Sequence, residues 1–435
     1  MLRKIGKFSL LKALVSGSAW SLFAGVAMQI GLFISTLLVN RTLGTYAFGQ
    51  FSLVTSTINF FVAVAGLGIS TAVIRYSAEL KDRDPNKLRR VISSLRTILL
   101  ITGSAATAIL IVISAVSPSL FGNREASFYI ALASPAAFFF TMDIFYKSIL
   151  IGFSDLRSFA ISAAISSVVS VPILYFSAIF FGLSGIVISI PVTALIQLKF
   201  TKSFAQLSLD RFSIGDLRGF DESELSLIVS FLIPTFLAGI ASSTAPWLVQ
   251  MLLARTSNGV VQVGIFNTAF QWFNLIMFFP VIYARVISPI LTEFVTSHQK
   301  GSTRKFFLSS IFVNAIFALP ASIVIASLSA NIMSFYSIFY AEAKDTLVIV
   351  AVAGLVAAVQ GPVSNLLVAQ SRMWLGAAMN FLWAAVYVIF AALFSNFGAR
   401  GVAGALLIAY IIHSVWGFMY SMNALRAHDR GASRL

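Results

Sequence analysis

Two side chains that can carry opposite charges lie inside an otherwise apolar stretch of this sequence. Asp143 lies close to the middle of the stretch FFFTMDIFYKSIL, and Lys147 follows four residues later. A spacing of four places both side chains on one face of a helix, where they can pair. Because an ionisable group inside a bilayer is costly unless it is paired or hydrated, we interpret them either as a structural ion pair or as a coupling or gating site that lines a cavity.

Arginine and glutamate recur at the ends of other apolar segments. Arg75 and Glu79 lie at the inner end of the second segment, and Arg285 and Glu293 follow the eighth. Such long side chains can simply reach out to the lipid headgroups. The guanidinium group can instead bind a phosphate through two parallel hydrogen bonds. Arg75 and Arg285 are therefore candidate substrate contacts, and Glu79 is a candidate gating group.

A second pair of arginines, Arg41 and Arg255, occupies matching places at the outer ends of the first and seventh segments. These two residues are further candidates for substrate contact at an outer gate. The alternative is that they cap helix ends, where four carbonyl groups lack partners within the helix.

Prolines within the apolar segments predict kinks. Proline has no amide hydrogen, so a bilayer tolerates it only where a neighbour satisfies the freed carbonyl group. Pro246 follows a Ser-Ser-Thr run, and Pro362 follows Gln360 and a glycine. Both prolines are candidate gating positions in helices that bend as a cavity opens, and Gln360 is a candidate substrate contact. His413, in the middle of the last segment, is interpreted either as a packed neutral imidazole or as a proton relay.

The sequence contains none of the motifs that would indicate an enzyme. There is no phosphate-binding loop, no GxSxG motif and no pair of histidines at metal-binding spacing. Cysteine is absent, which excludes disulfides and thiolate metal sites. We therefore expect no catalytic residues, no metal and no cofactor, and any work must be driven by a gradient or by the substrate. A sodium or proton coupling ion is left open.

Segments long enough to cross a bilayer dominate the chain. About 30 Å of hydrocarbon requires roughly 17 to 25 apolar residues in a helix. The sequence predicts an all-α polytopic membrane protein with about twelve spans, of which the sixth is the shortest. The predicted spans are 13–38, 48–73, 92–116, 128–151, 159–180, 183–198, 225–253, 260–282, 306–328, 347–369, 374–394 and 402–422.

The basic residues between these segments indicate the orientation. The chain has 30 Lys and Arg, and 25 of them fall on the side of the membrane that holds both termini. The other five are Arg41, Arg124, Arg255, Lys344 and Arg400. By the positive-inside rule both termini are cytoplasmic, and the basic N-terminus with the long apolar stretch after it predicts a retained first helix. The sequence pI near 10.2 then reflects topology and attraction to anionic lipid, and no loop is long enough to bind nucleic acid.

The longest hydrophilic stretch falls at the middle of the chain. It predicts a cytoplasmic linker at 199–224 between two six-helix bundles, 1–198 and 225–435. Because six is even, duplicated halves would keep the same orientation, as parallel repeats around a central cavity. LLVNRT at 37–42 matches MLLART at 251–256, and a second set of matches follows at one constant offset. The second set pairs Gly49, Phe51 and Asn59 with Gly264, Phe266 and Asn274.

Residues 40–80 carry a family resemblance. The stretch NRTLGTYAFGQFSLVTSTINFFVAVAGLGISTAVIRYSAEL resembles the polysaccharide flippases, of the O-antigen type, in the multidrug, oligosaccharidyl-lipid and polysaccharide (MOP) exporter superfamily. The matching positions are Leu43, Gly44, Phe48, Gly49, Gly66, Leu67, Gly68, Arg75, Tyr76 and Glu79. The plan of twelve helices with a central linker extends the resemblance over the whole chain.

The resemblance implies two six-helix bundles around a rather basic central cavity that opens to each side in turn. Such a flippase moves an undecaprenyl-diphosphate-linked glycan to the periplasmic leaflet of the bacterial inner membrane. Membrane lipid and other polysaccharide-assembly proteins are the further partners that it implies. On this reading Arg75, and more weakly Arg285, engage the pyrophosphate, while Asp143 with Lys147 helps to switch between states.

Two other classes of protein are weighed against the flippase. A cation-coupled multidrug exporter of the same superfamily commonly has an acidic cation site in its first helix, whereas this chain has Gln29 there. The lipid II flippases of the superfamily usually have fourteen helices. A membrane-embedded glycan polymerase or glycosyltransferase would need a large polar loop, but the longest external loop, at about 329–346, is small.

Overall fold

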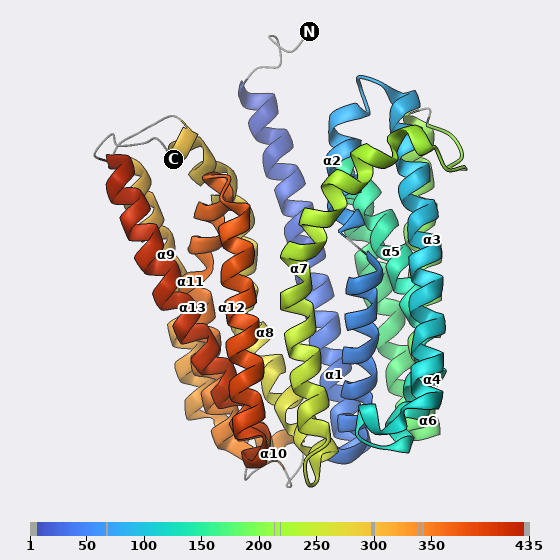
Figure 1. The fold of residues 1–435 in the computed structure, drawn as a ribbon, viewed down its shortest axis with the longest axis vertical. Helices are drawn as coiled ribbons and strands as arrows, with labels where there is room; N and C mark the ends of the chain where they lie inside the picture. Colours follow the sequence, from blue (N-terminus) through green and yellow to red (C-terminus); the bar gives the residue numbers. More distant parts are fainter. Residues whose placement is uncertain are drawn as a thin grey trace. The chain divides into compact units, whose positions relative to one another are not determined.

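A computed structural model describes residues 7–66, 68–212, 214–217, 219–296, 301–336, 340 and 343–429. Leu67 of the family motif lies outside the described residues, as do parts of the external loop near 340 and both extreme termini. The described part of the chain is built from α-helices and short 3-10 turns and contains no strand (Figure 1).

The helices follow one another with short connections. They are α1 (Lys7–Gly66), α2 (Ile69–Leu80), α3 (Pro85–Val116), α4 (Arg124–Ala133), α5 (Pro135–Gly152), α6 (Leu156–Arg211), α7 (Leu225–Ala254), α8 (Gly259–Thr296), α9 (Ser302–Ser327), α10 (Ser329–Tyr336), α11 (Lys344–Ala369), α12 (Met373–Phe394) and α13 (Gly398–Asp429). The 3-10 turns are η2 (Pro118–Phe121), η3 (Glu222–Glu224) and η5 (Ser395–Phe397).

Nine continuous helical stretches within the described residues are long and apolar enough to cross a bilayer. Three of them, α1, α6 and Met373–Ala427, each hold two of the spans predicted from the sequence. In α1 and α6 the division falls at a glycine with non-helical torsion angles, Gly44 and Gly182. The prediction of an all-α membrane protein with about twelve spans is therefore confirmed.

The α6 helix is a hairpin of two antiparallel limbs. Gly182 has φ 58° and ψ −143°, which lies in a region that residues with a Cβ seldom adopt. On either side of this turn, Gln197 Nε2 donates to Ser170 Oγ at 3.0 Å. At the open end Ser208 Oγ donates to Asp155 Oδ2 at 2.7 Å. These two contacts join the limbs at their middle and at their ends.

Asp155 also caps the start of α6, because its side chain accepts a hydrogen bond from the Ser158 amide at 3.2 Å. Burial raises the pKa of the Asp155 carboxyl, but hydrogen bonds from Ser208 and Ser158 and the charge of Arg211 lower it further. The net result is a pKa below the ordinary value. Asp155 therefore joins both ends of the α6 hairpin as a carboxylate.

The fourth predicted span is wrong as one continuous helix. Pro135 divides it into α4 and α5, because proline cannot donate to the carbonyl group of Ala131. The structure satisfies that carbonyl with the Ser134 hydroxyl, which donates to it at 2.8 Å. The second predicted span is likewise divided, since α1 ends at Gly66 and α2 begins at Ile69.

Two compact units make up the chain. Unit 1 comprises residues 1–42, 54–119 and 124–236, and unit 2 comprises 43–53, 120–123 and 237–435. Short segments from the N-terminal half therefore belong to unit 2. The predicted bundles, 1–198 and 225–435 with a linker between them, stay a prediction.

Within unit 1, the hydrophilic segment near the middle of the chain packs on α3. Its first part, to Arg211, is the end of α6. In its second part, Arg90 of α3 forms ion pairs with Asp221 at 3.2 Å and Glu224 at 3.4 Å. Arg96 of α3 donates to the Leu217 carbonyl oxygen at 2.7 Å. Basic side chains of α3 thus satisfy the polar groups of this segment.

The two halves of the chain repeat the same local geometry. Ser154 and Ser371, 217 residues apart, have φ values of 62° and 56° in the turns after α5 and α11. The three hydrogen bonds that close the first turn recur at the same offset in the second. Gly182 and Gly398 also match, with φ 58° and 62° and the same ψ of −143°. This recurrence supports the repeat read from the sequence.

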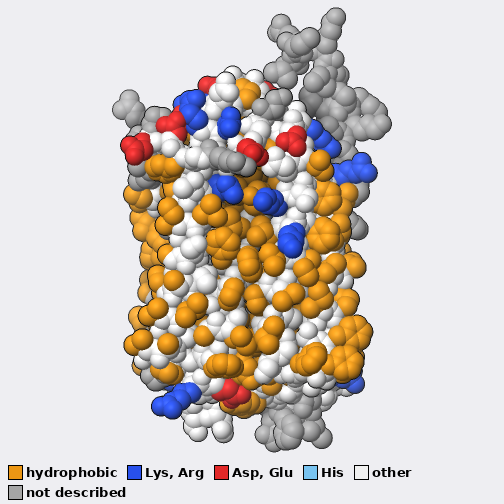
Figure 2. Space-filling view, turned by 90° about the vertical axis from the view of Figure 1, so that its right-hand side faces the viewer, with side chains coloured by type: hydrophobic (Ala, Val, Ile, Leu, Met, Phe, Trp, Pro, Cys, Tyr) orange, Lys and Arg blue, Asp and Glu red, His pale blue; other side chains and the backbone are white. Residues whose placement is uncertain are grey.

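The helices of unit 1 expose apolar side chains over their middle. Ile101 and Val112 on α3 and Phe180 on α6 are more than half exposed. Figure 2 shows hydrophobic side chains over the middle of the face turned to the viewer, with charged side chains gathered mainly toward one end. An apolar surface of this kind suits lipid tails, with the charges at headgroup level.

Candidate functional site

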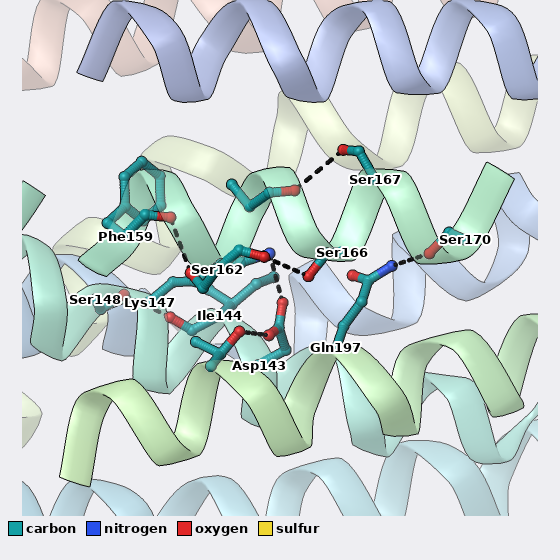
Figure 3. Close-up of polar contacts among 12 residues, drawn as sticks. Asp143, Ile144, Lys147, Ser148, Phe159, Ser162, Ser166, Ser167, Ser170 and Gln197 are labelled. Carbon is teal, nitrogen blue, oxygen red and sulfur yellow. Dashed lines mark hydrogen bonds and ion pairs between the residues drawn. The ribbon is translucent and has the colours of Figure 1, made fainter. Parts of the chain in front are cut away.

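A buried charged cluster in unit 1 contains the strongest candidate from the sequence. Asp143 and Lys147 both lie on α5, and Lys147 Nζ is 2.7 Å from Asp143 Oδ2. The two side chains are 3% and 15% exposed, so water screens the pair little. The Thr201 hydroxyl, on the second limb of α6, donates to Asp143 Oδ1 at 2.6 Å. Both carboxylate oxygens therefore have a partner (Figure 3).

Small polar side chains on the first limb of α6 lie beside this cluster. Figure 3 shows Ser162, Ser166 and Ser170 along the limb, with Gln197 reaching across to Ser170. The hydroxyls of Ser162 and Ser166 donate to carbonyl groups of their own helix, at 2.8 and 2.7 Å. These serines give the buried pair polar surroundings. The sequence predicted the Asp143 and Lys147 pair but missed Thr201, which lies 58 residues away along the chain.

A second buried polar cluster lies in unit 2, and its central residue is the counterpart of Asp143. The offset of 217 residues that relates the two serine turns carries Asp143 of α5 onto Gln360 of α11. Gln360 Oε1 lies 2.8 Å from His413 Nδ1 and accepts a hydrogen bond from the Ser414 hydroxyl at 2.9 Å. Both partners belong to α13. The structure thus joins two sequence candidates, Gln360 and His413, that were considered separately.

Pro362 removes a backbone hydrogen bond from α11, and another helix replaces it. The missing amide hydrogen of Pro362 frees the carbonyl group of Ala358, four residues earlier. Asn314 Nδ2, on α9, donates to that carbonyl oxygen at 2.9 Å. Asn314 is 1% exposed. The kink at Pro362 is therefore built into the packing of α9 against α11.

We expect Asn314→Leu to destabilise the protein by about 1 to 3 kcal/mol, because the Ala358 carbonyl group would lose its partner inside the protein. In a Pro362→Ala background, residue 362 can supply the missing amide hydrogen, so the penalty of Asn314→Leu should be clearly smaller. Thermal unfolding of the four proteins in detergent measures both penalties. Equal penalties in the two backgrounds would contradict this explanation of the kink.

Pro246, the other proline candidate, lies half-buried in α7. The hydroxyls of Ser242 and Ser243 both donate to the Gly239 carbonyl oxygen, at 2.8 and 3.4 Å. The Thr244 hydroxyl is buried and has no hydrogen-bond partner. The polar groups expected before Pro246 are thus present, and its role in gating stays a prediction.

Arg75 is exposed in unit 1 and makes a weak ion pair. Its Nε lies 3.8 Å from Glu79 Oε2 on the same helix, α2, and the two side chains are 56% and 48% exposed. The guanidinium group also lies 5.8 Å from the centre of the Tyr76 ring. An exposed pair of this length contributes little to stability, so an anion can compete with Glu79 for Arg75.

The remaining arginine candidates are also exposed. Arg285 and Glu293 lie on the second half of α8, in unit 2. Arg255, at the end of α7, donates to the Leu120 carbonyl oxygen at 3.4 Å, also within unit 2. Arg41 belongs to unit 1. The contact of Arg255 with a backbone carbonyl fits the capping interpretation, and the role of Arg41 and Arg255 at an outer gate stays a prediction.

Two glycines of unit 2 bring the backbones of α1 and α8 into direct contact. A Cβ atom built on Gly49 would overlap the carbonyl oxygen of Val260. A Cβ atom built on Gly264 would lie 2.5 Å from the carbonyl oxygen of Thr45. Gly49 with Thr45 and Gly264 with Val260 are related by the same offset, 215 residues. The contact is therefore reciprocal, and the sequence contained its signal as the match of Gly49 with Gly264.

The described residues contain no cluster of three or more His, Asp or Glu side chains that could hold a metal ion. The polar clusters instead contain one ion pair, one histidine and several amides and hydroxyls. Groups of these kinds can exchange hydrogen bonds or a proton as helices move.

Three comparisons relate the chain to known proteins. The family model described as polysaccharide biosynthesis protein matches residues 14–295. The chain is 22% identical over 403 residues to the EPS I polysaccharide export inner membrane protein EpsE of Ralstonia solanacearum, which covers 91% of each chain. It is 23% identical over 408 residues to the protein of the same name from Ralstonia nicotianae, again with 91% of each chain covered.

Solved structures show the same fold. A multidrug resistance MATE family transporter of the MOP superfamily, in its inward-facing conformation, matches with a TM-score of 0.79 and 15% identity, over 95% of this chain and 99% of that one. A MOP superfamily transporter from Pyrococcus furiosus matches with a TM-score of 0.68 and 16% identity, over 96% of each chain. The chain belongs to the polysaccharide biosynthesis protein family and has the fold of the MOP superfamily, which confirms the resemblance found at residues 40–80.

Proposed function

We propose that this protein is a flippase that moves a polyprenyl-diphosphate-linked oligosaccharide from the cytoplasmic to the periplasmic leaflet by alternating access. The glycan would be an O-antigen or exopolysaccharide repeat unit, and the lipid undecaprenyl diphosphate. The observation that carries the proposal is the family match over residues 14–295, together with relatives named as polysaccharide export proteins along 91% of both chains.

Transport of such a molecule is a problem of solvation. The pyrophosphate and the sugars cannot cross hydrocarbon, because charged and polar groups there lose their hydration. The polyprenyl tail can stay in the lipid throughout. The protein therefore needs cationic and polar groups that receive the head group, and helices that open to one side of the membrane at a time.

In this proposal each candidate residue has a role. Arg75 and Arg285 receive the pyrophosphate on entry, and Glu79 holds Arg75 until the substrate arrives. Arg41, Arg255 and Gln360 contact the substrate further along its path. The switch between states lies at Asp143 and Lys147, with bends at Pro246 and Pro362.

We expect Arg75→Ala to lower the translocation rate by about ten- to a hundredfold, because a hydrogen bond to a charged group contributes about 1.5 to 3 kcal/mol. Arg83→Ala is the matched control, since Arg83 is exposed in the same cytoplasmic connection and outside the candidate set. Both variants are compared in proteoliposomes at equal reconstituted amounts. An unchanged rate in Arg75→Ala would remove this residue from the entry site.

The multidrug exporter is the alternative. Its likeness to this chain is one of fold, at 15% identity, whereas the family model and the curated relatives concern polysaccharides. The relatives are named inner membrane export proteins, which supports a transporter of the inner membrane rather than an enzyme. The cytoplasmic position of both termini, and contacts with other assembly proteins, belong to the proposal.

Protein-dependent movement of a labelled undecaprenyl-diphosphate oligosaccharide in proteoliposomes tests the proposed function. Gradient-driven efflux of an amphipathic dye, without movement of the glycan, would favour the exporter instead.

A further inference from the structure

His413 is the ionisable member of the buried cluster in unit 2. It is 8% exposed, and its Nδ1 lies 2.8 Å from Gln360 Oε1 on α11. Ser414 donates to the same oxygen at 2.9 Å. Both α11 and α13 lie in stretches long and apolar enough to cross a membrane. This is therefore a polar contact between two helices inside the span.

The hydrogen bonds determine which ring nitrogen carries the hydrogen. An amide oxygen can only accept, so Nδ1 of His413 donates to Gln360. In the neutral imidazole the other nitrogen, Nε2, then has a free lone pair. Nε2 is buried and has no hydrogen-bond partner. A basic nitrogen is thus held inside the membrane span with its proton-accepting position vacant.

The ionisable groups on the helices around His413 lie mainly at helix ends. On α11 they are Lys344 and Asp345, at its start; on α12, Tyr387; on α8, Tyr283, Arg285 and Glu293; and on α13 itself, Arg400, Tyr410, Tyr420, Arg426, His428 and Asp429. The residues of α11 from Thr346 to Ala369 include no ionisable side chain. The packed cluster therefore has no carboxylate on α11 beside His413 to balance a second proton on the ring.

Taking the proposed function as given, we propose that His413 is a proton-binding site that couples protonation to the opening of the contact between α11 and α13. In the closed contact a charged imidazolium would be buried beside a neutral amide, which disfavours it. When the contact opens to water, Nε2 can take up a proton, and the charged ring then favours the open form. Lower pH therefore shifts the population toward the open contact.

The equivalent cluster in unit 1 differs in the way that this proposal requires. Asp143, the counterpart of Gln360, already has Lys147 at 2.7 Å as its opposite charge. Protonation of Asp143 would leave that lysine without its partner. The His413 cluster can gain or lose a proton without breaking an ion pair.

Cysteine labelling tests the proposal without any substrate, because the natural chain has no cysteine. Val363 on α11 is 3% exposed and faces Gly417 of α13, so Val363→Cys should react only when the contact opens. Its labelling rate is normalised to that of Asp82→Cys, at an exposed position in a loop. We expect the normalised rate to rise as the pH falls from about 8 to about 5, the range in which histidine titrates.

His413→Asn is the decisive variant, because the asparagine amide can replace Nδ1 as the donor to Gln360 but does not titrate. It should label at a rate independent of pH, and His413→Gln provides a second side chain that does not titrate. His428→Asn is the matched control and should keep the pH dependence. Gln360→Glu adds a carboxylate beside the ring and should move the transition upward by about one pH unit or more.

A pH dependence of labelling that persists in both His413 variants would overturn the proposal, as would a flat profile in the parent protein. In proteoliposomes, we expect a pH gradient to change the translocation rate of the parent protein but not that of His413→Asn. If the parent protein moves no lipid-linked glycan, the proposed function fails, while the labelling result still decides the role of His413.

Discussion

Replacing Asp143 with Asn is expected to destabilise the protein by about 3 to 5 kcal/mol and to abolish transport. The substitution keeps the size of the side chain and removes the charge that balances Lys147. Lys147 is 15% exposed, so it would be left as a buried charge with no counter-ion. Breaking a buried pair from one side has a cost of this size. Thermal unfolding in detergent, with transport measured in parallel, reads both effects.

A double variant separates the two interpretations of the pair. Asp143→Leu with Lys147→Met removes both charges and keeps comparable volumes, so much of the lost stability should return. If the pair is structural, transport returns with it. If the pair is a switch, transport stays low in a stable protein. A fully stable and active Asp143→Asn protein would contradict both interpretations.

We expect Gly49→Ala and Gly264→Ala each to destabilise the protein by at least about 1 to 3 kcal/mol, the usual range for overpacking. In both cases the added methyl group would collide with a backbone carbonyl oxygen, and a backbone cannot move aside as a flexible side chain can. The contact is reciprocal, so the two variants should have similar effects. Thermal unfolding of the purified variants measures them.

Gly404→Ala is the matched control for the glycine contact. Gly404 lies in α13, and a Cβ atom built there has no neighbour within 4 Å. Alanine should therefore be tolerated or slightly stabilising, because it favours a helix over glycine. If Gly49→Ala is as stable as Gly404→Ala, the close approach of α1 and α8 is not part of the stable fold.

The sequence predicted features that depend on local spacing. The length of the apolar segments predicted about twelve spans, and the spacing of four residues predicted the pair of Asp143 with Lys147. Both depend on helix geometry alone. The break at Pro135 was missed because proline is often tolerated in membrane helices, and whether a helix ends there depends on how the freed carbonyl group is satisfied.

Contacts between distant segments could not be predicted in this way. Thr201 meets Asp143, and Asn314 meets the carbonyl group freed by Pro362, through helix packing that leaves no pattern in either segment alone. The match of Gly49 with Gly264 was visible in the sequence. Its meaning, a reciprocal backbone contact, required the coordinates.

The central claim is that this protein moves a lipid-linked glycan across the membrane, and its most direct test is translocation of a fluorescent undecaprenyl-diphosphate oligosaccharide in proteoliposomes. Access of an external glycosidase to the glycan reports its leaflet, with protein-free vesicles and Asp143→Asn as controls. We predict that the glycan changes leaflet at a rate that scales with the amount of parent protein. The same slow rate with and without the protein, for several glycans, would contradict the account.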